Sequence, residues 1–459
     1  MKKKFYLFGL LAGIMFGMVG FASCCCPDDG SLSPEPAPAP APEPIPDPYA
    51  EMVKTPLTLE AIADGTITFS NNAAGAVTYT VDGGALQTIA AGASGDISVT
   101  AGQKVAFFGD NATYTDANDN YSYVSSTADF YAYGNVMSLV SSTDYANVTT
   151  LTEDGAFKGL FEYNTFLKSH PTNPLVLPAT TLTDECYYGM FRDCTGLTSA
   201  PALPAPALEF GCYHYMFKNC TGLTSAPALP ATTLAGNCYG GMFSGCTSLT
   251  SAPALPAMTL AMDCYSNMFA GCTGLTSAPA LPATTLADGC YGRMFEGCTG
   301  LTSAPDLPAT TLADYCYSNM FIDCTGLTSA PALPATTLAM YCYDSMFHSC
   351  TGLTSAPALP ATTLAEGCYE MMFQGCTSLT SAPDLLATTL VKNCYLQMFF
   401  HCTKLNYVKC MATDMSAENC TGNWLYYVAS TGTFVQKAGV NWSTGNPSGI
   451  PSGWQVQSE

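Results

Sequence analysis

Basic and titratable side chains are scarce in this chain. Its 459 residues include 14 Lys and Arg, 35 Asp and Glu, four His and three Trp, and only 11% of the residues are charged. A formal net charge of −21 repels the phosphate backbone, so we do not expect a nucleic-acid partner. None of the few histidines recurs beside a Ser or Cys and an acid in the manner of a catalytic triad, so we expect no enzymatic activity.

The first residues predict export. Three lysines precede an apolar run from Phe5 to Ala22, which is the layout of a signal peptide over residues 1–23. A transmembrane anchor is the alternative, because about 18 apolar residues approach the lower limit for crossing a bilayer. The stretch FASC, which ends at Cys24, resembles the lipobox of bacterial lipoproteins. This resemblance implies that Cys24 carries a lipid, with Cys25 and Cys26 as alternatives.

Residues 24–50 are expected to form a tether. Asp28 and Asp29 resemble the export tag that directs Bacteroidota lipoproteins to the outer face of the outer membrane. Proline occupies every second position from Pro34 to Pro48, which favours an extended polyproline II rod. At about 3.1 Å per residue, this rod is roughly 45 Å long. We therefore expect the working part to face outward from the cell surface, with the lipid anchor as its contact with the membrane.

Residues 51–154 have the alternating pattern of short β-strands. In AVTYTVDGGALQTI, an Asp-Gly-Gly tripeptide separates two alternating runs, which is a hairpin signal. The pattern predicts a small all-β, sandwich-like module. The loop DNATYTDANDNYSY is rich in the oxygen ligands that calcium prefers, but Tyr121 and Thr127 stand where an EF-hand needs Gly and Glu. We therefore favour a polar loop over a metal site.

Two columns of cysteines recur every 26 residues. The first column runs from Cys186 to Cys394 and the second from Cys194 to Cys402. Such regular spacing predicts that every repeat makes the same circuit, as in a solenoid. The expected parts of this region are a cap repeat over residues 155–185, the repeats over residues 186–410, and a C-terminal cap and tail over residues 411–459.

Each repeat contains the motif CYxxMFxxC followed by LTSAPALPATTL. Cys290, Met294 and Cys298 lie four residues apart, which predicts about two helical turns with one face directed inward. Proline cannot donate a hydrogen bond to a sheet, so we expect only a short strand near Leu301–Ala304, paired in parallel with its neighbours.

The string MFxxCTxLTSAPxLPATTL resembles the BspA-type leucine-rich repeat of bacterial surface proteins, over about residues 155–425. Proteins of this type are adhesins or host-interaction proteins, so the resemblance implies a binding function and no reaction. The expected fold class is an α/β, leucine-rich-repeat-like solenoid of 26-residue repeats with short parallel strands, preceded by a small all-β module.

The cysteines are expected to stay reduced. If the residues between Cys290 and Cys298 are helical, their Cα atoms lie about 12 Å apart, beyond disulfide reach. The two columns then serve as small buried apolar side chains, with bridges between adjacent turns as the alternative. An eight-residue gap without a recurring His does not assemble zinc ligands, so we expect neither a metal nor another cofactor.

Two surfaces are candidates for ligand contact. A Thr-Ser pair follows Leu in successive repeats and forms a hydroxyl ladder if it is exposed, although these hydroxyls can instead satisfy neighbouring backbone groups. The candidate ligand-binding residues on this ladder are Thr276, Ser277, Thr302, Ser303, Thr328 and Ser329. The second surface is the helix side of the repeats, where the residues between the core positions vary.

These observations favour a lipid-anchored surface protein that mediates adhesion or binds host or bacterial proteins. A glycan-binding surface protein is the first alternative, and a structural stalk without a specific ligand is the second. Under the glycan hypothesis, the aromatic platforms would be tyrosines of the β-rich module, namely Tyr114, Tyr121, Tyr123, Tyr131 and Tyr133.

Overall fold

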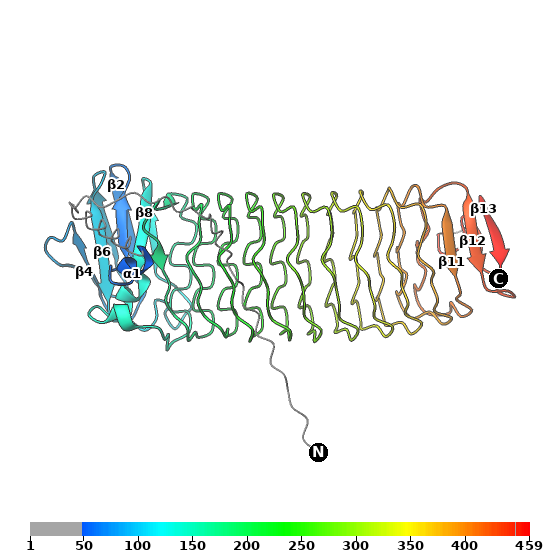
Figure 1. The fold of residues 1–459 in the computed structure, drawn as a ribbon, viewed down its shortest axis with the longest axis horizontal. Helices are drawn as coiled ribbons and strands as arrows, with labels where there is room; N and C mark the ends of the chain where they lie inside the picture. The colour runs from blue at the N-terminus through cyan, green and yellow to red at the C-terminus, as the bar shows by residue number, and fades with distance from the viewer. Residues whose placement is uncertain (1–47, 446) are drawn as a thin grey trace, which may run out of the picture. The chain divides into compact units, whose positions relative to one another are not determined.

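A computed structural model of the chain describes residues 48–445 and 447–459 (Figure 1). Residues Pro46–Glu459 form one compact unit. The predicted signal peptide, the predicted lipidation residue Cys24 and nearly all of the proline-rich tether lie outside the described residues. Among the helices of the described part, none combines the length and apolar character needed to cross a membrane.

Strands dominate the described secondary structure, and helix is almost absent. The helices in the described residues are one α-helix, α1 (Pro48–Val53), and two 3₁₀ helices, η1 (Val136–Leu139) and η2 (Tyr145–Asn147). The strands are β1 (Thr58–Ala61), β2 (Gly65–Ser70), β3 (Val77–Val81), β4 (Gln87–Ile89), β5 (Ser94–Val99), β6 (Lys104–Gly109), β7 (Tyr123–Ser126), β8 (Phe130–Asn135), β9 (Leu167–Ser169), β10 (Leu175–Val176), β11 (Tyr407–Cys410), β12 (Gly432–Gln436) and β13 (Trp454–Ser458).

The N-terminal strands form two open sheets that pack face to face. One sheet has the order β10-β8-β1-β6-β3-β4, with β9 also paired to β8, and the other has the order β5-β2-β7. The ring of Phe69 in β2 lies 5.3 Å from the ring of Phe107 in β6, so apolar side chains from both sheets share one core. The expectation that strands predominate before the repeats is confirmed.

The larger sheet continues into the first turn of the repeat region. Strands β9 and β10 both pair in parallel with β8, through Phe130 opposite Leu167 and Gly134 opposite Leu175. The edge of β7 is also bonded to this turn, because the backbone N–H of Val124 donates to the carbonyl of Leu160 at 2.8 Å. The N-terminal sheets therefore cover the first turn and form hydrogen bonds with several of its backbone N–H and carbonyl groups.

Each repeat is hydrogen-bonded to the next repeat along the chain. The N–H groups of Tyr291, Arg293 and Phe295 donate to carbonyls 25 residues later, at 3.0, 2.9 and 2.9 Å. Equivalent bonds recur from repeat to repeat, and Figure 1 shows the successive turns lying side by side. The predicted 26-residue repeat is therefore present as a stack of similar turns.

The prediction of a helix in the CYxxMFxxC motif is wrong. Within this motif, alternate N–H groups bond to the next repeat, and each N–H between them donates to the carbonyl three residues earlier. The N–H of Met294 donates to Tyr291 at 3.2 Å, and that of Cys298 donates to Phe295 at 3.0 Å. Positive φ values recur every fourth residue, at 61° for Gly289, 55° for Arg293 and 68° for Gly297. An α-helix does not admit such residues. We call this stretch, from the residue before the first Cys to the second Cys or its equivalent, the turn segment.

The composition of the turn segments explains how the chain adopts this conformation. Glycine, Asn and Asp tolerate the left-handed region better than other residues, and they occupy most of the positive-φ positions. Gly241, Asn267 and Asn319 belong to one such column, in which Arg293 stands between the last two. The spacing of four residues between Cys, Met and Cys is therefore the period of a series of turns.

The strand expected near Leu301–Ala304 is reduced to single parallel bridges. Ser303 pairs with Ser329, and at a later position of the following repeat Thr337 pairs with Thr363. Prolines between these points lack the N–H that would extend the pairing into a ladder. At the C-terminal end of the stack, β11, β12 and β13 pair in this order and form a continuous parallel sheet.

The core of the stack consists of columns of identical side chains. The rings of Tyr291 and Tyr317 lie 5.7 Å apart and nearly parallel, and those of Phe295 and Phe321 lie 5.6 Å apart. All four side chains are almost completely buried. Burial of a large apolar side chain stabilises by about 1.5–3 kcal/mol, and a packed ring pair adds about 0.5–1.5 kcal/mol. At the C-terminal end, Trp424 completes the tyrosine column, 6.2 Å from the ring of Tyr395.

The left-handed turn positions yield the first prediction. Gln397 has a φ of 52°, so Gln397→Gly should raise the free energy of unfolding by about 0.5–1 kcal/mol, because a side chain in this region costs about 1–2 kcal/mol. Lys404 is exposed and does not have a positive φ, so Lys404→Gly should lower the free energy of unfolding by a similar amount. Urea unfolding of both variants measures the two signs, and destabilisation by both would contradict the turn geometry.

Candidate functional site

The second cysteine column donates hydrogen bonds between repeats. The thiol of Cys298 donates to the carbonyl of Phe269 at 3.0 Å, and the same bond to the Phe carbonyl 29 residues earlier recurs along the column from Cys220 to Cys402. The column therefore has a polar role beyond filling space. Asn164 stands in this column in the first turn, where its amide donates to the carbonyl of Val124 in β7 at 2.9 Å.

The buried thiols are unsuited to nucleophilic or metal chemistry. The cysteines of the described residues are all free and buried. Burial raises the pKa of the Cys238 and Cys290 thiols to about 12, so the reactive thiolate is suppressed. Within the described part of the chain, no group of three or more His, Cys, Asp or Glu side chains is placed to hold a metal ion.

The expected hydroxyl ladder lies on the surface. Thr276, Ser277, Thr302, Ser303, Thr328 and Ser329 are all exposed. Among these six residues, the Thr328 hydroxyl donates to a neighbouring backbone carbonyl, that of Thr302, at 3.3 Å. The structure thus brings the six candidates to one face of adjacent repeats, where most of their hydroxyls are free to contact solvent or a ligand.

The exposed residues of the turn segments form a different surface, which we call the turn-side surface. Several large aromatic residues occupy its left-handed positions, including Tyr163, Tyr315 and Tyr427. The rings of Tyr315 and Tyr341 stack at 5.1 Å, and Tyr427 lies 4.1 Å from the ring of Tyr426. The sequence identified this side as variable, but its exposed tyrosines were missed. They could have been recognised as aromatic residues at positions where most other repeats have Gly, Asn or Asp.

The polar loop that resembled a calcium site has ion-pair and hydrogen-bond partners of its own. Asp119 accepts from the ammonium group of Lys158 at 2.7 Å, and the same group contacts Glu185 at 2.8 Å. Asp116 accepts from the backbone N–H groups of Asn118 and Asn120. The loop therefore fixes the N-terminal sheets to the first two turns.

The tyrosines considered as sugar platforms do not lie together. Tyr114 is completely buried and stacks on Phe157 at 6.1 Å, so its role as an exposed platform is excluded. Tyr131 and Tyr133 lie on β8, with their rings 4.9 and 5.1 Å from the ring of His170. Tyr121 and Tyr123 lie elsewhere, at a groove beside the first turn.

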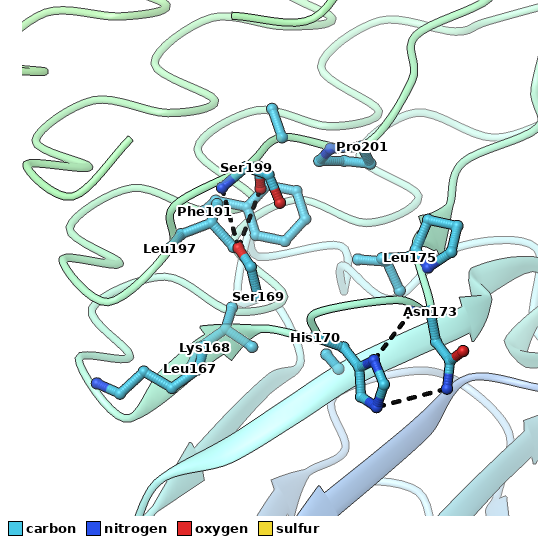
Figure 2. A pocket seen from close by; sticks show the side chains of 13 residues that line it. Leu167, Lys168, Ser169, His170, Asn173, Leu175, Phe191, Leu197, Ser199 and Pro201 are labelled. Atoms are coloured by element: carbon cyan, nitrogen blue, oxygen red, sulfur yellow. Dashed lines mark hydrogen bonds between the residues drawn. The ribbon is translucent and has the colours of Figure 1, made fainter. Parts of the chain in front are cut away.

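A small cavity lies between β9 and the following turns (Figure 2). Figure 2 shows Ser169 bonded to Ser199, whose N–H donates to the Ser169 hydroxyl at 3.0 Å, and His170 accepting from the N–H of Asn173 at 2.9 Å. The cavity measures about 50 Å³, which accommodates a few water molecules but is well below the size of ordinary ligand sites. We assign it no ligand.

A larger groove opens between β7 and the first turn. Its volume is about 300 Å³, at the lower end of the range for ligand sites. The lining residues are Tyr121, Tyr123, Val124, Ser125 and Ser126 from one side and Glu162, Tyr163, Asn164, Thr165 and Phe166 from the other. We call it the junction groove.

Acidic side chains of adjacent repeats face one another on the turn-side surface. Burial, together with the charges of Asp344 and Glu366, raises the pKa of Glu370 to about 7. One carboxylate oxygen of Glu370 is buried without a hydrogen-bond partner. Asp344 also has a raised pKa, mainly because it is buried, although the Ser345 and Ser318 hydroxyls donate to it. These carboxyl groups thus make the stack sensitive to pH.

Comparison of the chain with models of known families, with curated proteins and with solved structures gives no match.

The buried thiols yield a second prediction. In the native unit Pro46–Glu459, Ellman's reagent at about pH 8 should react with almost none of the twenty described cysteines, because they are buried and remain protonated. Full reaction of all twenty should follow denaturation without added reductant. Fewer than twenty reactive thiols after denaturation would show that bridges between repeats form.

Glu370 yields a third prediction, on pH dependence. Its folded pKa of about 7 lies above the ordinary value of 4.5, so the folded state binds the proton more tightly than the unfolded state. Stability should therefore fall as the pH rises from about 5 to about 8. Glu370→Gln should reduce this slope, measured by urea unfolding, whereas Asp306→Asn on the exposed face should leave it unchanged. An unaltered slope in Glu370→Gln would contradict the assignment.

Proposed function

We propose that this protein is a surface protein without catalytic activity, which binds host or bacterial proteins through the turn-side surface of its repeats. The observation that carries the proposal is the division within each repeat. The recurring Cys, Tyr, Met, Phe and Leu side chains are buried, whereas the residues that differ between repeats lie on the outside of the turn segments.

We also propose a fold type and a family for the repeats. The 26-residue repeats fit a leucine-rich-repeat-like solenoid of the BspA type, with the turn segment in the place where such a repeat has a helix. The parallel bridges between Ser303 and Ser329 and their equivalents support a strand side opposite to the turns. This class of repeat is suited to presenting an extended surface to a partner.

The turn-side surface is better suited to a specific protein partner than the hydroxyl ladder. One repeat has Gly292, Arg293 and Glu296, whereas another has Asp344, Ser345 and His348 at the corresponding places, with Ser345 buried. Tyrosine and arginine are enriched among the residues that dominate protein interfaces. The hydroxyl ladder has the same Thr-Ser pair in eight successive repeats and therefore offers a partner no distinct position along them.

The location is proposed from the N-terminal sequence. Lipid attachment at Cys24, followed by the acidic and proline-rich tether, would hold the compact unit outside the outer membrane. Adhesion would then require no further contact with the bilayer. A structural stalk would use the same anchor, and a binding measurement separates the two functions.

The experiment is a binding measurement with matched surface variants. The unit Pro46–Glu459 is immobilised and tested by surface plasmon resonance against fibronectin, fibrinogen and laminin. We expect saturable binding of at least one of them and a loss of about tenfold or more in the double variant Tyr426→Ala/Tyr427→Ala, because exposed aromatic residues dominate interfaces. The control is Thr302→Ala/Thr328→Ala, which alters the hydroxyl ladder alone and should bind normally.

Two results would overturn the proposal. Loss of binding in the hydroxyl-ladder variant, with normal binding in the tyrosine variant, would move the site to the ladder. Absence of saturable binding to all three proteins would favour a structural stalk or a glycan ligand.

A further inference from the structure

We propose that the junction groove binds a neutral saccharide. The groove is separate from the tyrosine pair tested above, since it lies where β7 meets the first turn. The site therefore goes beyond the protein-binding function proposed for the repeats.

Aromatic side chains face the groove from both of its walls. Tyr123 comes from β7, and Tyr163 and Phe166 come from the first turn. These side chains are 41%, 59% and 38% exposed, which leaves large ring surfaces uncovered in the free protein. A pyranose ring has faces of C–H groups that pack well on such aromatic surfaces, whereas its edge carries hydroxyl groups.

Hydrogen-bonding groups lie between the aromatic rings. The side-chain hydroxyls of Ser125 and Thr165 line the groove and make no hydrogen bond with other described residues. Each can donate one hydrogen bond and accept others, which matches the hydroxyl groups of a sugar. The groove volume of about 300 Å³ suits a short saccharide segment.

The charges at the groove favour a neutral ligand. Glu162 is the acidic residue of the lining, and its carboxylate pairs with the guanidinium of Arg192 at 3.2 Å. The hydroxyl of Tyr121 donates to the same carboxylate. Among the described residues, the lining includes no Lys, Arg or His that could hold a sulfate or uronate group. The net charge of −21 also repels anionic polymers.

The ring of Tyr163 is not required by the fold of its turn segment. Tyr163 has a φ of 60°, in the left-handed region, whereas the corresponding positions of three later repeats hold Gly245, Gly271 and Gly297. Glycine satisfies the turn geometry at this place without strain, so the turn does not require a tyrosine side chain here. The guanidinium of Arg192 lies 5.3 Å from the Tyr163 ring centre and supports the ring.

The two walls are held in place before a ligand arrives. The buried amide of Asn164 donates to the carbonyl of Val124, which joins the first turn to β7 beneath the groove. The bond between Tyr121 and Glu162 joins the same two parts. A groove fixed in this way loses little conformational freedom when it binds.

The test is calorimetric titration of the unit Pro46–Glu459 with neutral hexasaccharides of glucose, mannose, xylose and N-acetylglucosamine. A sulfated heparin hexasaccharide serves as the anionic comparison. We expect at least one neutral probe to bind with a Kd of about 1 mM or below, and Tyr163→Asn to weaken it about tenfold or more. Because Asn tolerates a positive φ, this variant should be at least as stable as the parent protein.

The matched control is Tyr427→Asn, which makes the same substitution at the equivalent position of the last turn segment, where φ is also 60°. It should leave saccharide affinity unchanged. Any of three results would overturn the proposal: no neutral probe binds, binding survives Tyr163→Asn, or the sulfated probe binds more tightly than every neutral one. Since the protein-binding test alters Tyr426 and Tyr427 instead, failure of one proposal is distinguishable from failure of the other.

Discussion

The hydrogen bonds between successive repeats are the constraint on which the rest of this structure depends. In a turn segment, every second N–H points to a carbonyl of the next repeat, and the N–H groups between them close turns within the same repeat. This division requires a left-handed residue at every fourth position, such as Gly289 and Gly297. It also keeps equivalent residues in register, so that each Tyr stacks on a Tyr and each Phe on a Phe. Register therefore converts a repeated sequence into continuous buried columns.

The same constraint explains the two ends of the stack. A terminal repeat leaves its outward N–H and carbonyl groups and one side of each aromatic column without a neighbouring repeat. At the N-terminal end, β7 and β8 bond to the first turn, and Tyr114 extends the aromatic column into the module. At the C-terminal end, Trp424 continues that column and stacks on Trp442 at 5.2 Å. The N-terminal sheets therefore belong to the same folded unit as the repeats.

The sequence predicted the length and the buried residues of the repeats because both depend on periodicity. The columns of Cys, Met, Phe and Tyr are buried as their spacing implied. Helix was predicted in error, because four-residue spacing fits two helical turns as well as it fits a ribbon of turns. The recurrence of Gly, Asn and Asp at the same spacing, as at Gly241 and Asn267, was the distinguishing signal. The junction groove could not be predicted, because Tyr123 and Tyr163 are forty residues apart and meet only when β7 packs on the first turn.

The measurement that tests this account most directly is deletion of one whole repeat from the unit Pro46–Glu459. Removal of residues 299–324 joins Cys298 to Thr325 and restores the sequence pattern, so every remaining repeat still meets its neighbour in register. The account predicts that this variant keeps its cysteines protected and unfolds cooperatively in urea. A deletion two residues shorter, over residues 299–322, should lose both properties, because it shifts the columns past one another. Equal behaviour of the two deletions, whether both fold or both fail, would contradict stacking in register.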